Sequence, residues 1–418
     1  MNSIKKSKFR VVELFAGVGG FRIGFNKVEK INKDGSASEK NKWDFVWANQ
    51  WEPSSKSQDA FKVYETRFGK SEKHLNQDIF TVKKTIIPEH EVLVGGFPCQ
   101  DYSVARTLSG EKGIEGKKGV LWWEIYKTIE AKKTPYVLLE NVDRLLKSPS
   151  KMRGRDFGIM LASLDKLGYN VEWRVLNAAE LGFPQRRKRV FIFAKKRNLN
   201  SSIKDSEYTP KDLVFSKGLF SKTYKVISIK NELETNLPKE DLVYISNNFN
   251  FKFYNSGYMS NGKIYTAEII SEQKNIVTIK SILDYESKKD AFIVNDRLDK
   301  WKYLKGSKKI ERVSKSGFSY IFSEGAIAFP DSLDKPSRTM LTSEGTINRS
   351  SHILFDELIH NYRTLTPIEA ERLNGFPDNW TSILTPRKRF FMMGNALVCG
   401  LVTDISKTLY SIIESDLN

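Results

Sequence analysis

Apolar residues in the first half of this 418-residue chain fall into short runs. Each run is four or five residues long, ends just before glycines or polar or charged residues, and alternates with segments of helical spacing. This alternation predicts an α/β fold built on a wound sheet. The runs are residues 11–15, 45–48, 91–94, 136–139 and 190–193. Because ligands bind at the carboxyl ends of strands in open α/β sheets, we expect the chemistry directly after these runs.

The pattern changes in the second half of the chain. Residues 197–338 are rich in Lys, Ser, Asn and Tyr with short β-like runs, which predicts a second, smaller and less regular β-rich module. Thr366 is expected to cap a helix that Gly375 ends, and residues 396–413 have apolar positions at helical spacing. We therefore expect a first domain at 1–197, a second at 198–345, and at 346–418 a hinge and a C-terminal helix that packs back on the first domain.

Composition narrows the setting without deciding the function. A formal net charge of +18 favours polyanionic partners, but a Lys-rich composition fits a biased genome equally well. Only two cysteines occur, Cys99 and Cys399, so no disulfide framework and no cysteine-rich metal site is expected. No apolar run suits a signal peptide or reaches the length of a membrane span. The chain is therefore expected to be cytoplasmic, with no membrane partner and no metal.

Two segments suit a nucleotide-like cofactor. Residues 15–21, FAGVGGF, follow the first apolar run, and their glycines allow a tight turn and close approach of a ligand to the backbone. A plain strand-to-helix turn explains them equally well, and no Gly-Lys-Ser/Thr follows as in a phosphate-binding loop. Trp51 and Glu52 follow the second run, where related folds place an apolar face for adenine and an acid for ribose. Asp78 and Ile79 give a weaker signal of the same kind.

A nucleophile is indicated at Cys99. It lies in residues 95–103, GGFPCQDYS, beyond the third run, where a thiolate can meet a substrate. Pro98 restricts the backbone beside it, and its polar neighbours argue against burial. By contrast, Cys399 lies among Leu397, Val398 and Leu401 and fits a buried, inert thiol.

An acid and a basic cluster complete the candidate chemistry. Glu140 follows the fourth run, where a carboxylate can bind a base edge and help to move a proton. Residues 185–189, QRRKR, precede the fifth run, and an arginine pair at alternate positions can hold a carbonyl, a phosphate or a carboxylate. Alone, Glu140 is better explained as a helix-capping acid, and residues 185–189 are better explained as a solvated basic turn.

Taken in order, these motifs resemble those of the bacterial DNA (cytosine-5) methyltransferase family. The matching segments are residues 15–20, 96–100, 140–142, 185–189 and 394–396. The resemblance implies a Rossmann-like, S-adenosylmethionine-dependent enzyme that methylates carbon 5 of a cytosine flipped out of double-stranded DNA, with 198–345 as its target-recognition domain. By matching motif, Cys99 would add to carbon 6 of the base, Glu140 would contact N3 and the exocyclic amine, and Arg187 and Arg189 would orient the cytosine carbonyl and Glu140.

The resemblance also implies a cofactor site. Phe15 and Trp51 would flank adenine, Glu52 or Gln50 would meet the ribose, and Leu121 and Asn395 would line the methionine end. The full expected set is Phe15, Ala16, Gly17, Gly19, Gly20, Gln50, Trp51, Glu52, Asp78, Ile79, Pro98, Leu121, Asn395 and Ala396. The family commonly has an acid where Gln50 stands and a Ser where Ala396 stands. Gln100, Ser103 and Arg338 would contact DNA, Arg338 by holding phosphate.

Other functions remain as alternatives. A tRNA cytosine-5 methyltransferase would not need so large a basic insert, and a non-catalytic DNA-binding relative would be expected to have lost Cys99, Glu140 or the arginines. Exocyclic-amine methyltransferases carry an Asp/Asn-Pro-Pro-aromatic motif that this sequence lacks. The favoured hypothesis is the modification enzyme of a restriction-modification system. It is expected to act as a monomer and to share its site with a cognate restriction endonuclease without a stable complex.

Overall fold

The computed structural model describes residues 9–40, 43–53, 55–97, 121–199, 207–314 and 317–417. These residues form two compact units. The sheet unit is drawn from 1–177, 188–274 and 399–418, and the small unit from 178–187 and 275–398. The division of the chain by function, at residues 198 and 345, stays a prediction.

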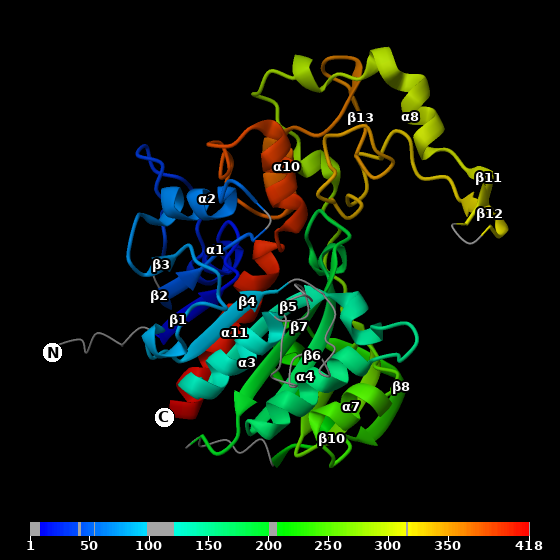
Figure 1. Cartoon of the computed structure of the whole chain (residues 1–418). Coiled ribbons are helices and arrows are strands. Elements are labelled where there is room, and N and C mark those ends of the chain that lie inside the picture. Colours follow the sequence, from blue (N-terminus) through cyan, green and yellow to red (C-terminus); the bar gives the residue numbers. More distant parts are fainter. Residues whose placement is uncertain are drawn as a thin grey trace. The chain divides into compact units, whose positions relative to one another are not determined.

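One large sheet is the frame of the sheet unit. Its strands among the described residues are β1 (Phe9–Leu14), β2 (Trp43–Asn49), β3 (His74–Leu75), β4 (Val92–Gly96), β5 (Tyr136–Val142), β6 (Tyr169–Asn177), β7 (Lys188–Lys196), β8 (Val226–Asn236), β9 (Ser256–Ser260) and β10 (Lys263–Ser271). They lie in the order β3-β2-β1-β4-β5-β7-β6-β9-β10-β8 (Figure 1). The first five strands in this order are parallel to one another, and the later neighbours are antiparallel. All five predicted runs lie in or overlap this sheet, which confirms the α/β class.

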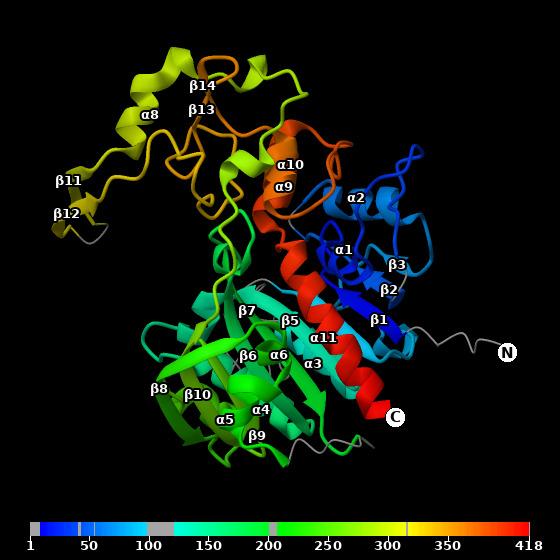
Figure 2. The ribbon, with the colours of Figure 1, turned by 180° about the vertical axis from the view of Figure 1, so that it is seen from behind.

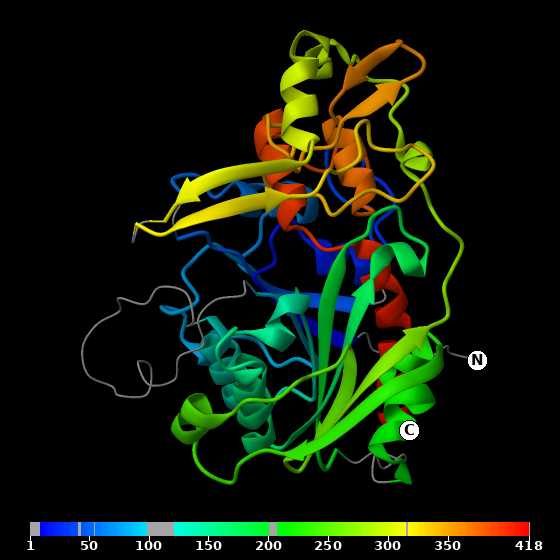
Figure 3. The ribbon, with the colours of Figure 1, turned by 90° about the vertical axis from the view of Figure 1, so that its right-hand side faces the viewer.

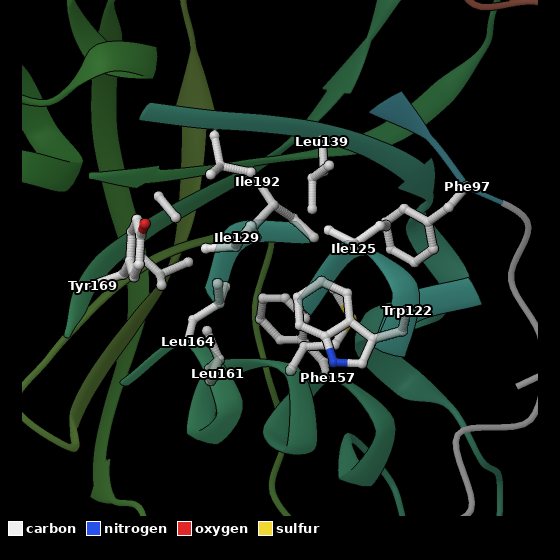
Figure 4. Packing of buried hydrophobic residues seen from close by; sticks show 14 of the residues in the cluster. Phe97, Trp122, Ile125, Ile129, Leu139, Phe157, Leu161, Leu164, Tyr169 and Ile192 are labelled. Atoms are coloured by element: carbon white, nitrogen blue, oxygen red, sulfur yellow. The ribbon is translucent and has the colours of Figure 1, made fainter. Parts of the chain in front are cut away.

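Helices cover both faces of the sheet. They are α1 (Gly20–Asn26), α2 (Asp59–Phe68), α3 (Leu121–Lys132), α4 (Arg155–Lys166), α5 (Pro210–Asp212), α6 (Leu219–Thr223), α7 (Leu242–Asn248) and α11 (Cys399–Leu417). Figure 1 shows α3, α4 and α7 on one face, and Figure 2 shows α6 and α11 on the other. Trp122 and Phe157, from α3 and α4, pack with Leu139 and Ile192 of the sheet (Figure 4). Burial of each such side chain contributes about 1.5–3 kcal/mol.

The sheet is wider than the sequence predicts. Residues 207–274, expected in a separate module, supply β8, β9 and β10, and β9 pairs with β6. The apolar pattern misses β6 because Glu172 and Arg174 are buried in it. Glu172 accepts hydrogen bonds from the N–H groups of Leu219 and Phe220 at the start of α6, at 2.8 and 2.9 Å. Arg174 donates to the carbonyl of Tyr224 just beyond that helix, at 2.6 Å. The two charges thus hold both ends of one short helix against the sheet.

The predicted C-terminal helix is α11, which lies in the sheet unit. Asp416, near its end, accepts from the hydroxyl of Tyr136 at 2.7 Å and from Lys195 at 3.0 Å. By length and composition, Pro386–Leu417 contains a segment apolar enough to cross a membrane, which corrects the expectation that no stretch is long enough. Half of that segment is buried inside the protein, however, and Ile405 and Leu409 are fully enclosed. These contacts are those of a core helix.

The small unit contains little regular structure. Its elements are α8 (Leu298–Lys305), β11 (Lys308–Val313), β12 (Ser319–Glu324), β13 (Leu354–Asp356), β14 (Asn361–Arg363), α9 (Pro367–Leu373) and α10 (Pro386–Asn395). The predicted cap of α9 is confirmed, because the Thr366 side chain accepts from the N–H of Glu369 and the Glu369 carboxylate accepts from the N–H of Thr366. Arg363 donates to both oxygens of the same carboxylate at 2.7 Å. A buried ion pair therefore organises the interior of this unit.

Candidate active site

The parallel strands β1, β2, β4 and β5 of the sheet unit end at the same edge. Leu14, the last residue of β1, pairs with both Asn49 and Gly95, and the next residue of β4, Gly96, pairs with Glu140. Because these strands are parallel, the segments that follow them begin at the same edge. The Gly-rich turn, the Gln50 segment, the chain that leads to Cys99, and Glu140 are therefore neighbours, as the sequence motifs require.

The Gly-rich turn has a strained backbone and an open side. Phe15, Gly17 and Gly19 have φ values of 54°, 56° and 89°. A Cβ added to Gly19 would lie 2.4 Å from the Phe68 ring, whereas one added to Gly17 would meet nothing within 4 Å. The Gly17 N–H donates to Oε1 of Gln50 at 2.7 Å. Packing thus requires Gly19, while Gly17 leaves an open cradle braced by Gln50.

A buried acid lies directly before this turn. Glu13 is fully enclosed, and burial raises the pKa of its carboxyl group to about 8. The Tyr64 hydroxyl donates to Oε2 at 3.0 Å, and Oε1 has no hydrogen-bond partner among the described residues. Nearby, Arg22 lies over the Phe68 ring at 4.2 Å. This polar network fixes the strand end from which the turn departs.

The other expected adenosine contacts follow β2 and β3. Trp51 is 37% exposed, a large aromatic face left open to solvent. Glu52 is partly buried, and burial, together with the charge of Asp59, raises its pKa. Asp78 is partly buried and Ile79 is buried. These positions offer a ligand one apolar face and two carboxyl groups.

Lys84, which the sequence motifs do not single out, anchors the Asp78–Ile79 segment. Its ammonium group donates to the carbonyl oxygens of Ile79 and Val82 at 2.6 and 3.1 Å. It also pairs with the buried carboxylate of Glu124 at 2.6 Å. Glu124 lies one helical turn after Leu121, the first residue of α3 and an expected cofactor contact. One buried ion pair therefore holds two of the expected cofactor positions in a fixed relation.

Glu140 and Arg189 form the central pair of the site. The Arg189 guanidinium lies 3.0 Å from the Glu140 carboxylate, and their side chains are only 16% and 13% exposed. The antiparallel pairing of β5 with β7 sets this contact, since Arg189 lies opposite Val142, two residues beyond Glu140 on the same side of the strand. The sequence predicts both the residues and their contact. In this setting the arginine neutralises and orients the carboxylate.

Asn141 has a role that the motif did not reveal. Its side-chain amide donates to the carbonyl of Phe97 at 2.9 Å, and its oxygen accepts from the N–H of Val142 at 2.8 Å. Phe97 is the last described residue before Cys99. Asn141 therefore ties the strand that bears Glu140 to the chain that leads to the expected nucleophile.

Four expected site residues, Pro98, Cys99, Gln100 and Ser103, lie outside the described residues. The other cysteine, Cys399, is 2% exposed and has a free thiol, whose pKa burial raises well above its ordinary value. The prediction of a buried, inert thiol is confirmed for Cys399.

Ala16 and Gly20 lie in the sheet unit, whereas Arg187, Asn395 and Ala396 belong to the small unit. Arg187 is buried and donates to the carbonyls of Met340 and Gly394 at 3.1 and 2.9 Å. Asn395 is exposed at the end of α10 and Ala396 follows it. These contacts make Arg187 a brace between two segments of the small unit.

Arg338, expected to hold phosphate, has internal partners. Its guanidinium donates to both oxygens of Asp331 at 2.7 and 3.1 Å and to the carbonyl of Ser350 at 3.1 Å. The side chain is 19% exposed. Arg338 therefore joins Asp331 to the Ser350 segment within the small unit.

Comparison with known proteins identifies the family of the chain. The sequence profile of C-5 cytosine-specific DNA methylases matches residues 9–411. The chain belongs to this family. The type II methyltransferase M.Sau3AI of Staphylococcus aureus is 52% identical over 412 residues, which cover 97% of this chain and 96% of that protein. M1.ScrFI of Lactococcus lactis subsp. cremoris is 26% identical over 98% of this chain and 80% of its own length.

Solved structures support the fold alone. Dnmt2 of S. pombe matches with a TM-score of 0.57 and 15% identity over 97% of this chain and 99% of its own. A DNMT2 mutant of Spodoptera frugiperda matches with a TM-score of 0.59 and 14% identity over 96% of this chain and 100% of its own. These structures confirm the predicted methyltransferase fold. The family profile and M.Sau3AI confirm the predicted family and cytosine-5 methyltransferase activity, and the family uses S-adenosylmethionine.

Replacing Lys84 by Met should weaken binding of S-adenosylmethionine to this methyltransferase about tenfold, the loss expected for a hydrogen bond to a charged group. The KM for the cofactor should rise while kcat stays close to that of the wild type. Lys127→Met is the matched control, because Lys127 pairs with the same carboxylate at 2.8 Å but is 58% exposed. Calorimetric titration measures the affinities, and equal weakening by both variants would contradict the assignment.

Replacing Glu13 by Gln should change how stability depends on pH. Since the pKa of Glu13 is raised from 4.5 to about 8 in the folded protein, its stabilising contribution is complete below pH 4.5 and is lost as the pH rises toward 8. Gln cannot ionise, so the variant should gain on the wild type by roughly 1 kcal/mol per pH unit between pH 5 and 8. Urea unfolding at several pH values measures this, and a difference that does not vary with pH would refute it.

Proposed function

We propose that this methyltransferase modifies a flipped-out cytosine within a specific sequence of double-stranded DNA, and that Glu140 and Arg189 hold the base. The observation that carries the proposal is their ion pair at the edge where the strands end. In this proposal the carboxyl group of Glu140 contacts N3 and the exocyclic amine of cytosine. Arg189 orients that group and reaches the cytosine carbonyl. Arg187, the other arginine expected for this task, is assigned to bracing the segments at Met340 and Gly394.

Cys99 is the proposed nucleophile. Carbon 5 of cytosine is a poor nucleophile until a thiolate adds at carbon 6 and makes the ring an enamine. The enamine carbon 5 would take its methyl group from S-adenosylmethionine, which would leave as S-adenosylhomocysteine. Loss of the carbon-5 proton then lets the bond between Cys99 and carbon 6 break, which restores the ring and releases the thiolate. The hydrogen bond from Asn141 to the carbonyl of Phe97 supports this role, since it fixes the chain two residues before the thiol.

The proposed cofactor site fits an adenosine-containing ligand. The cradle at Gly17 is open, and the exposed Trp51 offers a flat apolar face for adenine. Asp78 and Ile79 would meet the adenine edge, and Glu52 is the proposed ribose contact because the Gln50 amide already braces Gly17. The remaining contacts are proposed for Phe15, Ala16, Gly19, Gly20, Pro98, Leu121, Asn395 and Ala396.

The proposed biological setting is a restriction-modification system. M.Sau3AI, which matches over nearly the whole chain, is a type II methyltransferase. We propose by analogy that this chain acts in the cytoplasm as a monomer, that residues 198–345 recognise its target with help from Gln100 and Ser103, and that a cognate endonuclease shares the site. A tRNA substrate and a non-catalytic role are less well supported, because the matching family profile is that of DNA methylases and the Glu140–Arg189 pair is intact.

Glu140→Gln should lower kcat about 100- to 1,000-fold, the usual cost of losing a group that stabilises developing charge. Arg189→Ala should cost a similar factor, and the double variant should lose less than the product of the two because the residues act on one another. Glu91→Gln is the control, since it alters an ion pair with Arg10 at the start of β4. Bisulfite sequencing of DNA methylated by each variant reports both the modified carbon and its sequence context. Full activity of Glu140→Gln would refute the proposal.

Cys99→Ser should abolish methylation while DNA binding persists, whereas Cys399→Ser should remain active because its thiol is buried in the core. DNA with 5-fluorocytosine at the target should trap a denaturation-resistant adduct with the wild type and with Cys399→Ser only. Denaturing gel electrophoresis detects the adduct. Substantial turnover by Cys99→Ser would end the covalent mechanism.

A further inference from the structure

The small unit carries a two-stranded ribbon, β11 and β12, that pairs with no other strand among the described residues (Figure 3). Several apolar side chains of this ribbon are exposed to solvent. Val313, Phe318 and Ile321 are 67%, 70% and 69% exposed. Solvent-exposed ribbons with apolar side chains are a liability unless something contacts them. This exposure points to a binding element.

Hydrogen bonds fix the segments that come directly before β11 and directly after β12. Arg349 donates to the carbonyls of Leu304 and Gly306 at 2.8 and 3.1 Å on one side, and to the carbonyl of Gly325 on the other. Buried Lys305 donates to the carbonyl of Ser351 at 2.7 Å and pairs with Asp331 at 3.3 Å. Arg349 and Lys305 thus fix the two segments from which the ribbon extends. A contact element fixed in this way loses little conformational entropy on binding.

One face of the ribbon combines aromatic rings with a cation. The register pairs Ile310 with Phe322 and Arg312 with Tyr320, so these four side chains share a face. The Arg312 guanidinium lies over the Phe322 ring, 3.8 Å from its centroid. Stacking holds the guanidinium flat and leaves its N–H edge available for a planar partner.

We propose that this ribbon enters the major groove of the target DNA and that Arg312 binds a guanine there. A two-stranded ribbon fits the width of that groove, and a flat guanidinium matches the O6 and N7 acceptors of guanine. Lys309, Glu311 and Ile321 lie on the opposite face, so the proposal places Arg312 on the base edges. The inference rests on the proposed function, and it moves DNA recognition from Arg338, which has internal partners, to an exposed element.

Charge distinguishes DNA from a second copy of the chain as the occupant. Among the described residues, neither Lys309 nor Arg312 has a carboxylate within ion-pair distance, whereas Glu324 lies 3.8 Å from Lys308 and 3.7 Å from Arg349. The exposed cations of the ribbon, Lys309 and Arg312, outnumber its one exposed acid, Glu311, so the exposed charge of the ribbon is positive by one. Two such ribbons would repel one another, while a polyanion would be attracted.

The first test compares Arg312→Ala with Arg297→Ala, a control that removes the same charge from another exposed site of the small unit. For Arg312→Ala, kcat/KM on the cognate duplex should fall by about tenfold to hundredfold, the discrimination expected from a bidentate contact. Binding to non-cognate duplex and the melting temperature should match those of the control. Unchanged cognate activity, or equal losses on cognate and non-cognate DNA, would overturn the proposal. A wild-type enzyme that methylates no duplex would overturn the proposed function, and this inference with it.

The second test does not depend on Arg312. The photoreactive residue p-benzoylphenylalanine replaces Phe318 at the exposed end of the ribbon, with a control at Tyr285, which is 60% exposed in the same unit. Irradiation with labelled cognate duplex should give a protein–DNA crosslink at position 318 in several-fold excess over position 285. A crosslink to a second copy of the chain, or no excess over the control, would overturn the proposal.

Discussion

The parallel register of β1, β2, β4 and β5 is the constraint on which the site depends. Leu14 stands beside Asn49 and Gly95, and Gly96 stands beside Glu140, so the segments that follow these strands share one edge. The antiparallel pairing of β7 then brings Arg189 to the same place. A slip of one residue in β5 would turn Glu140 to the other face of the sheet. Residues far apart in the sequence meet because the apolar strands admit only one alignment.

Buried polar groups fix the segments at that edge. Apolar packing sets the sheet, but a loop that approaches a ligand needs directional contacts to hold its shape. Lys84 supplies them for the Ile79 segment, Asn141 for Phe97, and Gln50 for the Gly17 turn. Each tie joins a loop to a strand, a helix or another loop, and each satisfies a backbone group that water would otherwise bind. Polar contacts therefore set the positions of the loops at the site, and the apolar core sets the position of the sheet that carries them.

The sequence predicts what depends on local pattern and misses what depends on distant geometry. Fully buried strands give continuous apolar runs, so β1, β2, β4, β5 and β7 are visible in the chain. Strand β6 is not, because its charges serve a helix that follows it. The contact of Glu140 with Arg189 is predicted through the family motif. The contacts of Arg187 with Met340 and Gly394 are not predicted, because the two arginines are alike in sequence and the chain passes from the small unit to the sheet unit between them.

The positive charge of the chain illustrates the same limit. A net charge of +18 suggests many cations for DNA, yet several are committed within the protein. Arg187, Lys305 and Arg363 are at most 1% exposed. Such buried cations do not release counterions from DNA, because a phosphate cannot reach them. Attraction to DNA must come from the exposed cations, of which Lys309 and Arg312 are two, and composition does not reveal where on the surface these cations lie.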